Sequence, residues 1–138
     1  MLRSIALTLV LLMIAIALSA AGRQRGMILR LTQADSGSTV TLHPGDTLEI
    51  VLPGNPTTGY TWEVKPGAEA LLKQKGDPEF APDSKALGAG GRTTIRFDVI
   101  AAGKASLVLI YHRTFEQAVP PLRNFGIRVV VTDEQSKK

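Results

Sequence analysis

The segment Thr93-Thr-Ile-Arg-Phe-Asp-Val-Ile100 alternates more cleanly than any other stretch of this 138-residue sequence. Its apolar side chains share one face of an extended chain and its polar side chains share the other: Ile95, Phe97 and Val99 against Thr94, Arg96 and Asp98. A period of two residues is typical of a β-strand that packs one face on a core and leaves the other in water. The segment therefore predicts a half-buried strand within a sheet.

Short segments of the same kind lie on both sides of it, separated by turns rich in Gly, Pro, Asp and Ser. We expect further strands at residues 27–32, 40–42, 47–52, 61–65, 105–111 and 127–132. The last two are rich in β-branched residues, and we expect them to be buried on both faces. Residues 67–75 predict a strand or a single helical turn. About seven short strands indicate an all-β, immunoglobulin-like antiparallel β-sandwich.

The beginning of the chain has the three-part layout of a secretory signal peptide. Arg3 supplies a positive start, residues 5–18 form an apolar run interrupted only by Thr8, and small residues precede Gly22. As a helix this run would be about 21 Å long, shorter than the roughly 30 Å hydrocarbon core of a bilayer. We expect cleavage after Ala21, with an uncleaved membrane anchor as the alternative. Residues 22–138 would then form a single exported domain, periplasmic or extracellular.

Composition excludes several classes of function. The chain has no Cys, which excludes a disulfide scaffold, a thiol nucleophile and a lipoprotein anchor, and its two His leave little for metal or acid–base chemistry. The net charge of +4 is small and dispersed, so nucleic acid is not expected as a partner. Ser84 and Ser106 lack a nucleophile motif. We expect no catalytic residues, no metal, no cofactor and no enzymatic activity, in a protein that is a monomer.

The segment Pro53-Gly-Asn-Pro-Thr-Thr-Gly-Tyr60 is unlike a minimal connection between strands. Pro56 fixes its own φ and favours an extended Asn55, while the two glycines allow backbone angles that other residues resist. The pattern predicts a stiff projecting loop with Thr57 and Thr58 at its tip. Taken alone, such a loop is either a binding element or simply a rigid turn.

Two later segments are also candidate binding loops. Residues 76–92 exceed the usual length of a connection, and their Gly-rich end precedes a strand instead of the helix that a phosphate-binding loop requires. Residues 112–121 join two strands through Arg113, Phe115 and two prolines, and an exposed aromatic beside an Arg is a typical interface anchor. The alternative for residues 76–92 is a tolerated surface insertion, and the alternative for Phe115 is packing within its own loop. In an immunoglobulin-like sandwich alternate loops gather at one end, so the three could form one binding edge.

Together these segments resemble the chagasin family of protein inhibitors of papain-type cysteine proteases. Asn55-Pro-Thr-Thr-Gly-Tyr60, followed by Trp62, matches the family's Asn-Pro-Thr-Thr-Gly-aromatic loop. Gly88-Ala-Gly-Gly91 matches its Gly-X-Gly-Gly loop, and Arg113-Thr-Phe115 falls where the family has Arg-Pro-Trp. The order and spacing of the three motifs agree over residues 27–132, and the departures are Thr for Pro and Phe for Trp in the third.

The resemblance implies a reversible, competitive inhibitor that plugs the cleft of a papain-family protease. The first loop would lie over the catalytic Cys, with its Thr side chains hydrogen-bonding near that site, and the other two loops would grip the sides of the groove. The third loop would bind more weakly than in the family because Phe offers less contact area than Trp. The implied protease-binding residues are Asn55, Pro56, Thr57, Thr58, Gly59, Tyr60, Gly88, Ala89, Gly90, Gly91, Arg113, Thr114 and Phe115.

The main alternative is a secreted β-sandwich that binds a carbohydrate, a cell-wall component or another protein ligand through the same edge. Tyr60 and Phe115 could stack on a sugar as readily as they pack on a protease. Trp62, in contrast, is expected in the core, because a buried Trp is typical of such sandwiches. A membrane is expected as a partner only if the N-terminal segment is not cleaved.

Overall fold

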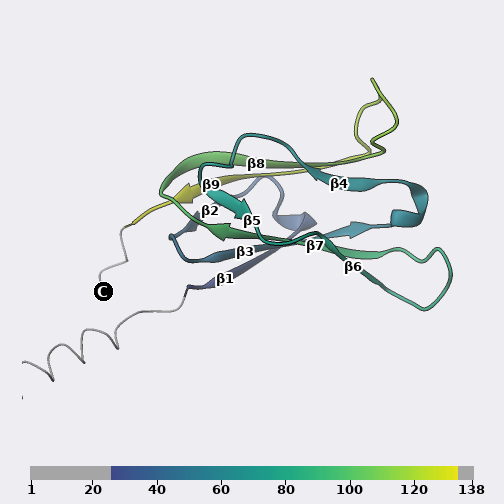
Figure 1. The fold of residues 1–138 in the computed structure, drawn as a ribbon, viewed down its shortest axis with the longest axis horizontal. Coiled ribbons are helices and arrows are strands. Elements are labelled where there is room, and N and C mark those ends of the chain that lie inside the picture. Colours follow the sequence, from purple (N-terminus) through teal and green to yellow (C-terminus); the bar gives the residue numbers. More distant parts are fainter. Residues whose placement is uncertain (1–25, 134–138) are drawn as a thin grey trace, which may run out of the picture.

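The computed structural model describes residues 26–133, in which two β-sheets pack face to face (Figure 1). Sheet A contains β1 (Ile28–Thr32), β3 (Thr47–Gly54), β5 (Leu72–Gln74), β6 (Glu79–Pro82) and β7 (Gly91–Val99). Sheet B contains β2 (Thr39–Leu42), β4 (Thr61–Val64), β8 (Gly103–His112) and β9 (Arg123–Val131). The predicted all-β sandwich is confirmed. The predicted signal peptide at residues 1–21 lies outside the described residues.

Strand β7 joins the parts of sheet A and has the alternation that its sequence predicts. Ile95, Phe97 and Val99 are buried. On one side β7 pairs antiparallel with β3, from Thr47 opposite Asp98 to Gly54 opposite Gly91. On the other side it pairs with β5 and, further along, with β6. The long β3–β7 pairing carries the sheet from one end of the sandwich to the other.

Strands β8 and β9 form the centre of sheet B, and the prediction that both their faces are buried is wrong. Phe125, Ile127 and Val129 are buried on β9, whereas Arg128 between them is exposed. Val108 of β8 likewise remains 37% exposed. Within the described part of the chain no third layer covers sheet B. Its β-branched residues therefore reflect strand propensity on a one-sided sheet and not a doubly buried one.

The strand count and pairing differ from the expectation in two ways. Residues 26–133 form nine strands instead of about seven, and β1 and β2 pair parallel with β3 and β9. Strand β6 lies within the segment predicted to be a long loop, residues 76–92. All four of its residues are exposed, so its sequence has no alternation of buried and exposed positions. Backbone pairing with β7 holds it in place instead.

The core between the sheets is aliphatic, with few aromatic side chains. Its most buried side chains are Leu42, Leu48, Ile50, Leu52, Ile95, Leu107, Leu109, Phe125 and Val129. Trp62 of β4 is also buried, as expected. Its indole N–H donates a hydrogen bond of 2.9 Å to the carbonyl of Pro53 at the end of β3. This bond links the core directly to the connection between β3 and β4.

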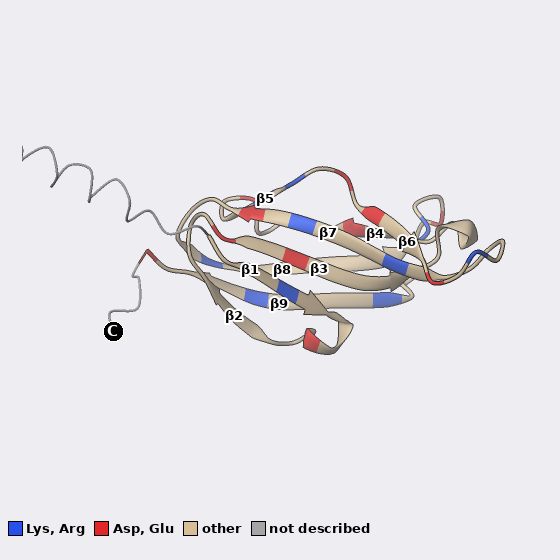
Figure 2. Ribbon diagram, turned by 90° about the horizontal axis from the view of Figure 1, so that it is seen from below, with Lys and Arg blue, Asp and Glu red and all other residues tan. Residues whose placement is uncertain are grey.

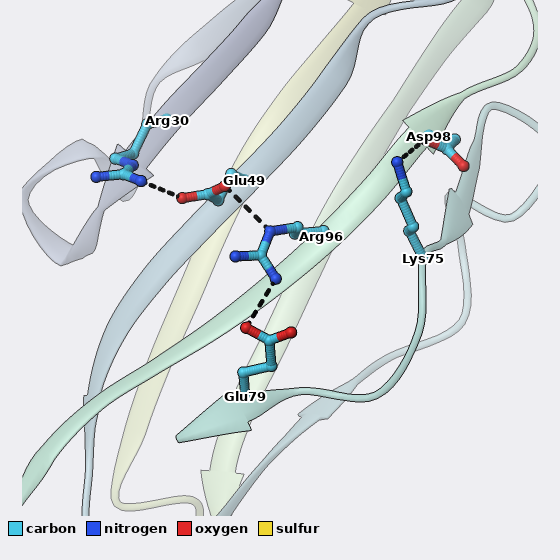
Figure 3. A network of polar contacts seen from close by, with 6 residues as sticks. All are labelled: Arg30, Glu49, Lys75, Glu79, Arg96 and Asp98. Carbon is cyan, nitrogen blue, oxygen red and sulfur yellow. Dashed lines mark hydrogen bonds and ion pairs between the residues drawn. The ribbon is translucent and has the colours of Figure 1, made fainter. Parts of the chain in front are cut away.

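The outer face of sheet A carries a row of alternating charges across four strands (Figures 2 and 3). Arg30 of β1 lies 2.6 Å from Glu49 of β3, Glu49 lies 3.1 Å from Arg96 of β7, and Arg96 lies 3.0 Å from Glu79 of β6. We call these four residues the charge ladder. Burial alone would raise the pKa of Glu49, but the hydrogen bonds from Arg96 and Arg30 outweigh it and hold that pKa below its usual value. The ladder thus links the edge strands β1 and β6 to the middle of the sheet.

Three long connections project from the same end of the sandwich, at the right of Figure 1. They join β3 to β4, β6 to β7 and β8 to β9. The first residue of β1 and the last residue of β9 lie at the opposite end. The predicted gathering of the three candidate loops at one edge is therefore what the strand directions produce.

Candidate functional site

The site is built from three loops, which we define by residue range. Loop 1 is residues 55–60 between β3 and β4, loop 2 is residues 83–90 between β6 and β7, and loop 3 is residues 113–122 between β8 and β9. Loops 1 and 2 are carried by neighbouring strands, since β3 pairs with β7. Loops 1 and 3 are likewise linked through the pairing of β4 with β8. The sheets therefore bring both flanking loops to the sides of loop 1.

Loop 1 closes through the side chain and backbone of Asn55. Its backbone is extended, with φ of −149° and ψ of 96°, and Pro56 begins a single 3₁₀ turn, η2 (Pro56–Thr58). The Asn55 Oδ1 accepts hydrogen bonds from the Thr57 N–H at 3.2 Å and the Thr57 hydroxyl at 2.5 Å. The Asn55 carbonyl accepts the Thr58 hydroxyl at 2.6 Å. The predicted stiff loop with exposed Thr57 and Thr58 is present.

The two threonine hydroxyls point back into loop 1 and donate their hydrogen bonds to Asn55. Each hydroxyl has one proton to donate, and each proton is used on Asn55. Because the backbone of Asn55 is extended, its side-chain and carbonyl oxygens are free to accept hydrogen bonds from the turn that follows. Toward a partner the two hydroxyls can therefore accept hydrogen bonds, but their protons are already used within the loop.

Gly59 within loop 1 and Gly54 just before it are needed for different reasons. Gly59 has a φ of +81°, the left-handed conformation that the sequence predicts. Gly54 does not adopt a positive φ; a Cβ there would lie 2.9 Å from the hydroxyl oxygen of Thr93. The expectation of an unusual backbone angle is thus wrong for Gly54, which instead allows β3 and β7 to approach closely.

Loop 2 is attached to loop 1 through Asn55, whose Nδ2 donates a hydrogen bond of 3.0 Å to the Gly88 carbonyl. Gly88 has a φ of +73°, and just before it Leu87 is fully exposed, with a relative accessibility of 104%. Gly91, in contrast, is a buried residue of β7, where a Cβ would overlap the Ala81 carbonyl. The Gly-rich motif therefore divides into an exposed part and a part that packs strands together.

Loop 3 is attached to loop 1 through Arg113. The Arg113 Nε donates a 2.9 Å hydrogen bond to the Thr58 carbonyl, and another guanidinium nitrogen lies 2.9 Å from the Glu116 carboxylate. The guanidinium carbon lies 4.4 Å from the centre of the Tyr60 ring, within cation–π range. The hydrogen bond to Glu116 raises the pKa of Arg113 above its usual value. The side chain is therefore a permanent cation held between two loops.

A column of aromatic rings continues from this guanidinium into the core. The rings of Tyr60 and Tyr111 stack with centroids 5.3 Å apart, and the rings of Tyr111 and Trp62 lie 5.0 Å apart. The Tyr111 hydroxyl also accepts a 2.8 Å hydrogen bond from the Asn55 N–H. Buried Tyr111 and Trp62 thus give loop 1 a rigid base. Their place in alternating strands predicts burial, but not this stacking.

Exposed apolar side chains flank loop 1 on loops 2 and 3. Phe115 is 72% exposed at the position where an anchor is predicted, next to exposed Thr114. Leu87, Val119 and Leu122 are also exposed, and they were not among the predicted site residues. An isolated apolar residue within a Gly-, Pro- and Ser-rich loop is the sequence signal that could have identified them. The edge is therefore polar and compact at its centre and apolar at its sides.

A depression of about 570 Å³ opens between the loops. Asn55, Thr58 and Tyr60 of loop 1 line it together with residues of loop 2 and of the β8–β9 region. Among residues 26–133 there is no group of three His, Asp or Glu side chains that could hold a metal ion. Nor does this part of the chain contain a helix long and apolar enough to span a membrane.

The two histidines lie in different places. His112 ends β8 at the base of loop 3, with its Nε2 2.5 Å from the Glu63 carboxylate on β4. His43 lies in the turn between β2 and β3, at the end of the sandwich opposite loop 1. The two therefore do not form a common site.

A β-sandwich that displays three interlinked loops at one end belongs to the class of loop-presenting binding proteins. The model of the family described as "Chagasin family peptidase inhibitor I42" matches residues 41–129. The chain therefore belongs to the chagasin family of peptidase inhibitors. The predicted family membership and the predicted function as a protease inhibitor are confirmed.

Relatives and solved structures agree with this assignment. Chagasin of Trypanosoma cruzi is 39% identical over 88 residues, which cover 61% of this chain and 80% of chagasin. The solution structure of Amebosin superimposes with a TM-score of 0.63 at 30% identity, covering 77% of this chain and 98% of the other. The crystal structure of the cysteine protease inhibitor EhICP2 from Entamoeba histolytica has a TM-score of 0.70. It covers 80% of this chain and all of EhICP2, and at 23% identity it shows the shared fold alone.

Proposed function

We propose that this protein reversibly and competitively inhibits papain-family cysteine proteases by inserting loops 1, 2 and 3 into the active-site cleft. The observation that carries the proposal is loop 1, a pre-formed turn held between two loops that expose apolar side chains. Membership of a peptidase inhibitor family supports it, and EhICP2, which has the same fold, is a cysteine protease inhibitor. The protein acts by binding and has no enzymatic activity of its own.

The chemistry of loop 1 suits the catalytic centre of such an enzyme. A papain-type protease attacks with a thiolate held by a His, in a groove that accepts extended peptides. The tip of loop 1 carries only the small side chains of Thr57 and Thr58, whose hydroxyl protons are already used within the loop. The loop backbone can therefore approach the catalytic Cys closely without a deep pocket. Cleavage is slow if no carbonyl of the loop lies in line with the thiolate.

Pre-organisation explains how a loop of six residues could bind tightly. Association costs free energy for every side chain and loop that must be ordered. In loop 1 the turn is closed by Asn55, and the base is held by the Tyr111 hydroxyl before any partner arrives. Little ordering remains to oppose binding, so most of the contact energy is available as affinity.

The flanking loops supply the apolar contacts. Phe115 and Leu87 are exposed on either side of loop 1 and would be buried against the walls of the groove. Exposed Gly88 and Gly90 let the backbone of loop 2 approach a partner closely. Gly91 is buried and a Cβ there would overlap the Ala81 carbonyl, so we assign it to the packing of β7 against β6 instead of to protease contact.

The unit that inhibits is a single monomeric domain, residues 22–138, exported to the periplasm or the extracellular space. The support for export is the N-terminal sequence, with its positive start, its apolar run and the small residues before Gly22. N-terminal sequencing of the protein recovered from the secreted or periplasmic fraction tests it. A mature protein that begins at Gly22 is expected, and an intact Met1 in a membrane pellet would indicate the uncleaved anchor.

Titration of papain activity with the purified protein tests the inhibitor proposal. A stoichiometric loss of activity is expected, and no loss at micromolar protein would overturn it. Thr58→Arg places a long side chain at the tip of loop 1 and is expected to weaken inhibition by at least about 1.4 kcal/mol, or tenfold. The matched control is Thr41→Arg, at an exposed position of β2, which should leave inhibition unchanged. Full inhibition by a folded Thr58→Arg variant would remove loop 1 from the centre of the mechanism.

A further inference from the structure

The side chain of Arg113 is turned toward its own chain, although Arg113 belongs to the Arg113–Phe115 motif that is expected to contact a protease. Its Nε is bonded to the Thr58 carbonyl, a terminal nitrogen to Glu116, and its planar face lies over Tyr60. The side chain is only 34% exposed. To reach a partner, the guanidinium would have to give up contacts that it already makes.

The contacts of Arg113 join loop 3 to loop 1 at two places, the tip and the last residue. The Thr58 carbonyl belongs to the tip of loop 1, and Tyr60 is its last residue. Tyr60 in turn stacks on Tyr111 of the core, so one guanidinium is linked both to the tip and to the rigid base. Glu116, three residues further along loop 3, holds the far side of the guanidinium. Loop 3 therefore cannot move relative to loop 1 without breaking this arrangement.

We propose that Arg113 is a positioning residue: it locks loop 3 against loop 1 in the free inhibitor and acts on the protease through Thr58 and Phe115, without touching it. This inference rests on the proposed function for its effect on inhibition. Its structural part concerns the free protein alone. Glu116 has the supporting role of orienting the guanidinium.

The geometry around Gly59 shows why the position of loop 3 matters. A Cβ added to Gly59 would lie 3.3 Å from Cε1 of Phe115, so the exposed Phe115 ring is in close contact with the loop 1 backbone. A shift of loop 3 would move the ring relative to Thr58 and change the shape of the combined edge. A Lys could keep the charge of Arg113, but it lacks the planar fork that serves the carbonyl, the carboxylate and the ring together.

Amide hydrogen exchange of the free protein tests the structural part. The Thr58 and Gly59 amides donate to the carbonyls of Asn55 and Pro56 within loop 1. In Arg113→Met both amides are expected to exchange at least about tenfold faster, because the loop opens more often once the lock is removed. The matched control, Arg123→Met, removes an exposed cation from the same end of the sandwich and should leave both rates within about twofold.

Inhibition of papain tests the functional part. Arg113→Met and Arg113→Lys are both expected to weaken inhibition about tenfold, because neither restores the lock. Glu116→Gln should weaken it less, and the double variant Arg113→Met/Glu116→Gln should be no worse than Arg113→Met, since Glu116 acts through Arg113. Unfolding midpoints establish that the variants are folded, and if Arg113→Met fails to fold, Arg113→Lys carries both measurements.

Two results would overturn the proposal. Unchanged exchange of the Thr58 and Gly59 amides together with weakened inhibition would make Arg113 a direct protease contact. Full inhibition by Arg113→Lys would mean that only the charge matters. Failure of the proposed function is a different result: the unsubstituted protein would not inhibit papain, while the exchange measurements would still decide whether the lock exists.

Discussion

Loop 1 and its two flanking loops lie at the same edge of the sandwich but differ in where their side chains point. In loop 1, side-chain hydroxyls and an amide are bonded inward and the exposed tip carries only small residues. In loops 2 and 3, large apolar side chains, Leu87 and Phe115, point outward. The centre is ordered by hydrogen bonds, whereas the flanks offer surface for burial. A central plug needs a fixed shape, and the flanks need contact area.

The two regions also depend on each other. Asn55 of loop 1 donates to Gly88 of loop 2, and Arg113 of loop 3 donates to Thr58 of loop 1. Loop 1 is therefore the common partner of both flanks. Changes in the residues that join the loops should disturb more than one loop, whereas truncation of an exposed apolar side chain on a flank should cost mainly its own contact.

The largest effect is expected from Asn55→Ala. This substitution removes the acceptor for the Thr57 N–H and hydroxyl and the donor to Gly88. We expect inhibition to weaken about 100-fold, or about 2.7 kcal/mol, as measured by papain titration. The matched control, Asn124→Ala at an exposed position of β9, should have no effect. If Asn55→Ala inhibits as well as the control, the internal bonding of loop 1 is not what makes it a plug.

Phe115→Ala tests the apolar flank on loop 3. We expect a loss of about 1 to 3 kcal/mol in inhibition and little change in stability, because an exposed aromatic contributes to binding and not to the core. Phe115→Trp should strengthen inhibition by roughly twofold to tenfold, because the indole adds contact area and a donor. A loss below about 0.3 kcal/mol in the Ala variant would show that Phe115 is no anchor.

Leu87→Ala tests the other flank and is expected to cost less. Truncation of one aliphatic side chain at an interface should weaken inhibition by about 1 kcal/mol, or roughly fivefold. Ile28→Ala is the control, since Ile28 is 66% exposed at the opposite end of the sandwich. Equal inhibition constants for the two variants would show that Leu87 does not contact the protease and that only loop 3 supplies apolar contacts.

The smallest effect on inhibition is expected from Glu49→Gln in the charge ladder, which lies on the outer face of sheet A and outside the loops. Inhibition should stay within about twofold. Stability should respond to pH instead. Because the native pKa of Glu49 is lowered, its stabilising contribution is complete above the ordinary pKa of a carboxyl group and is lost as the pH falls through the lowered native value. Unfolding midpoints at neutral and acidic pH should therefore differ less in Glu49→Gln than in the unsubstituted protein.

The alternating strands could be predicted from the sequence, and β6 could not. From Ile95 to Val99 of β7 every second residue is buried, which is the signal that periodicity detects. In β6 all four residues are exposed, and the strand is held by backbone pairing with β7 and by the ion pair of Glu79 with Arg96. The parallel pairing of β1 with β3 and of β2 with β9 could not be predicted either. Alternation predicts which face of a strand is buried but not the direction of its neighbour.

In the site, the sequence predicts the loop motifs but not the direction of each side chain. Proline and glycine predict a stiff loop 1, since their effect on the backbone is local. Whether Arg113 faces a partner or its own chain depends on Tyr60 and Glu116, which only the fold brings around it. The same holds for Gly91, which lies in the exposed motif by sequence and in the strand packing by structure.

By itself, the sequence determined the β class, the three candidate loops and the family, because alternation, turn residues and motif spacing are properties of neighbouring residues. Tertiary structure alone decided that Asn55 joins loops 1 and 2, that Arg113 joins loops 1 and 3, and that the Thr57 and Thr58 hydroxyls turn inward. Asn55 and Gly88 are 33 positions apart, and Arg113 and Thr58 are 55 apart. Contacts over such separations depend on how two sheets pack, and local sequence patterns do not encode that packing.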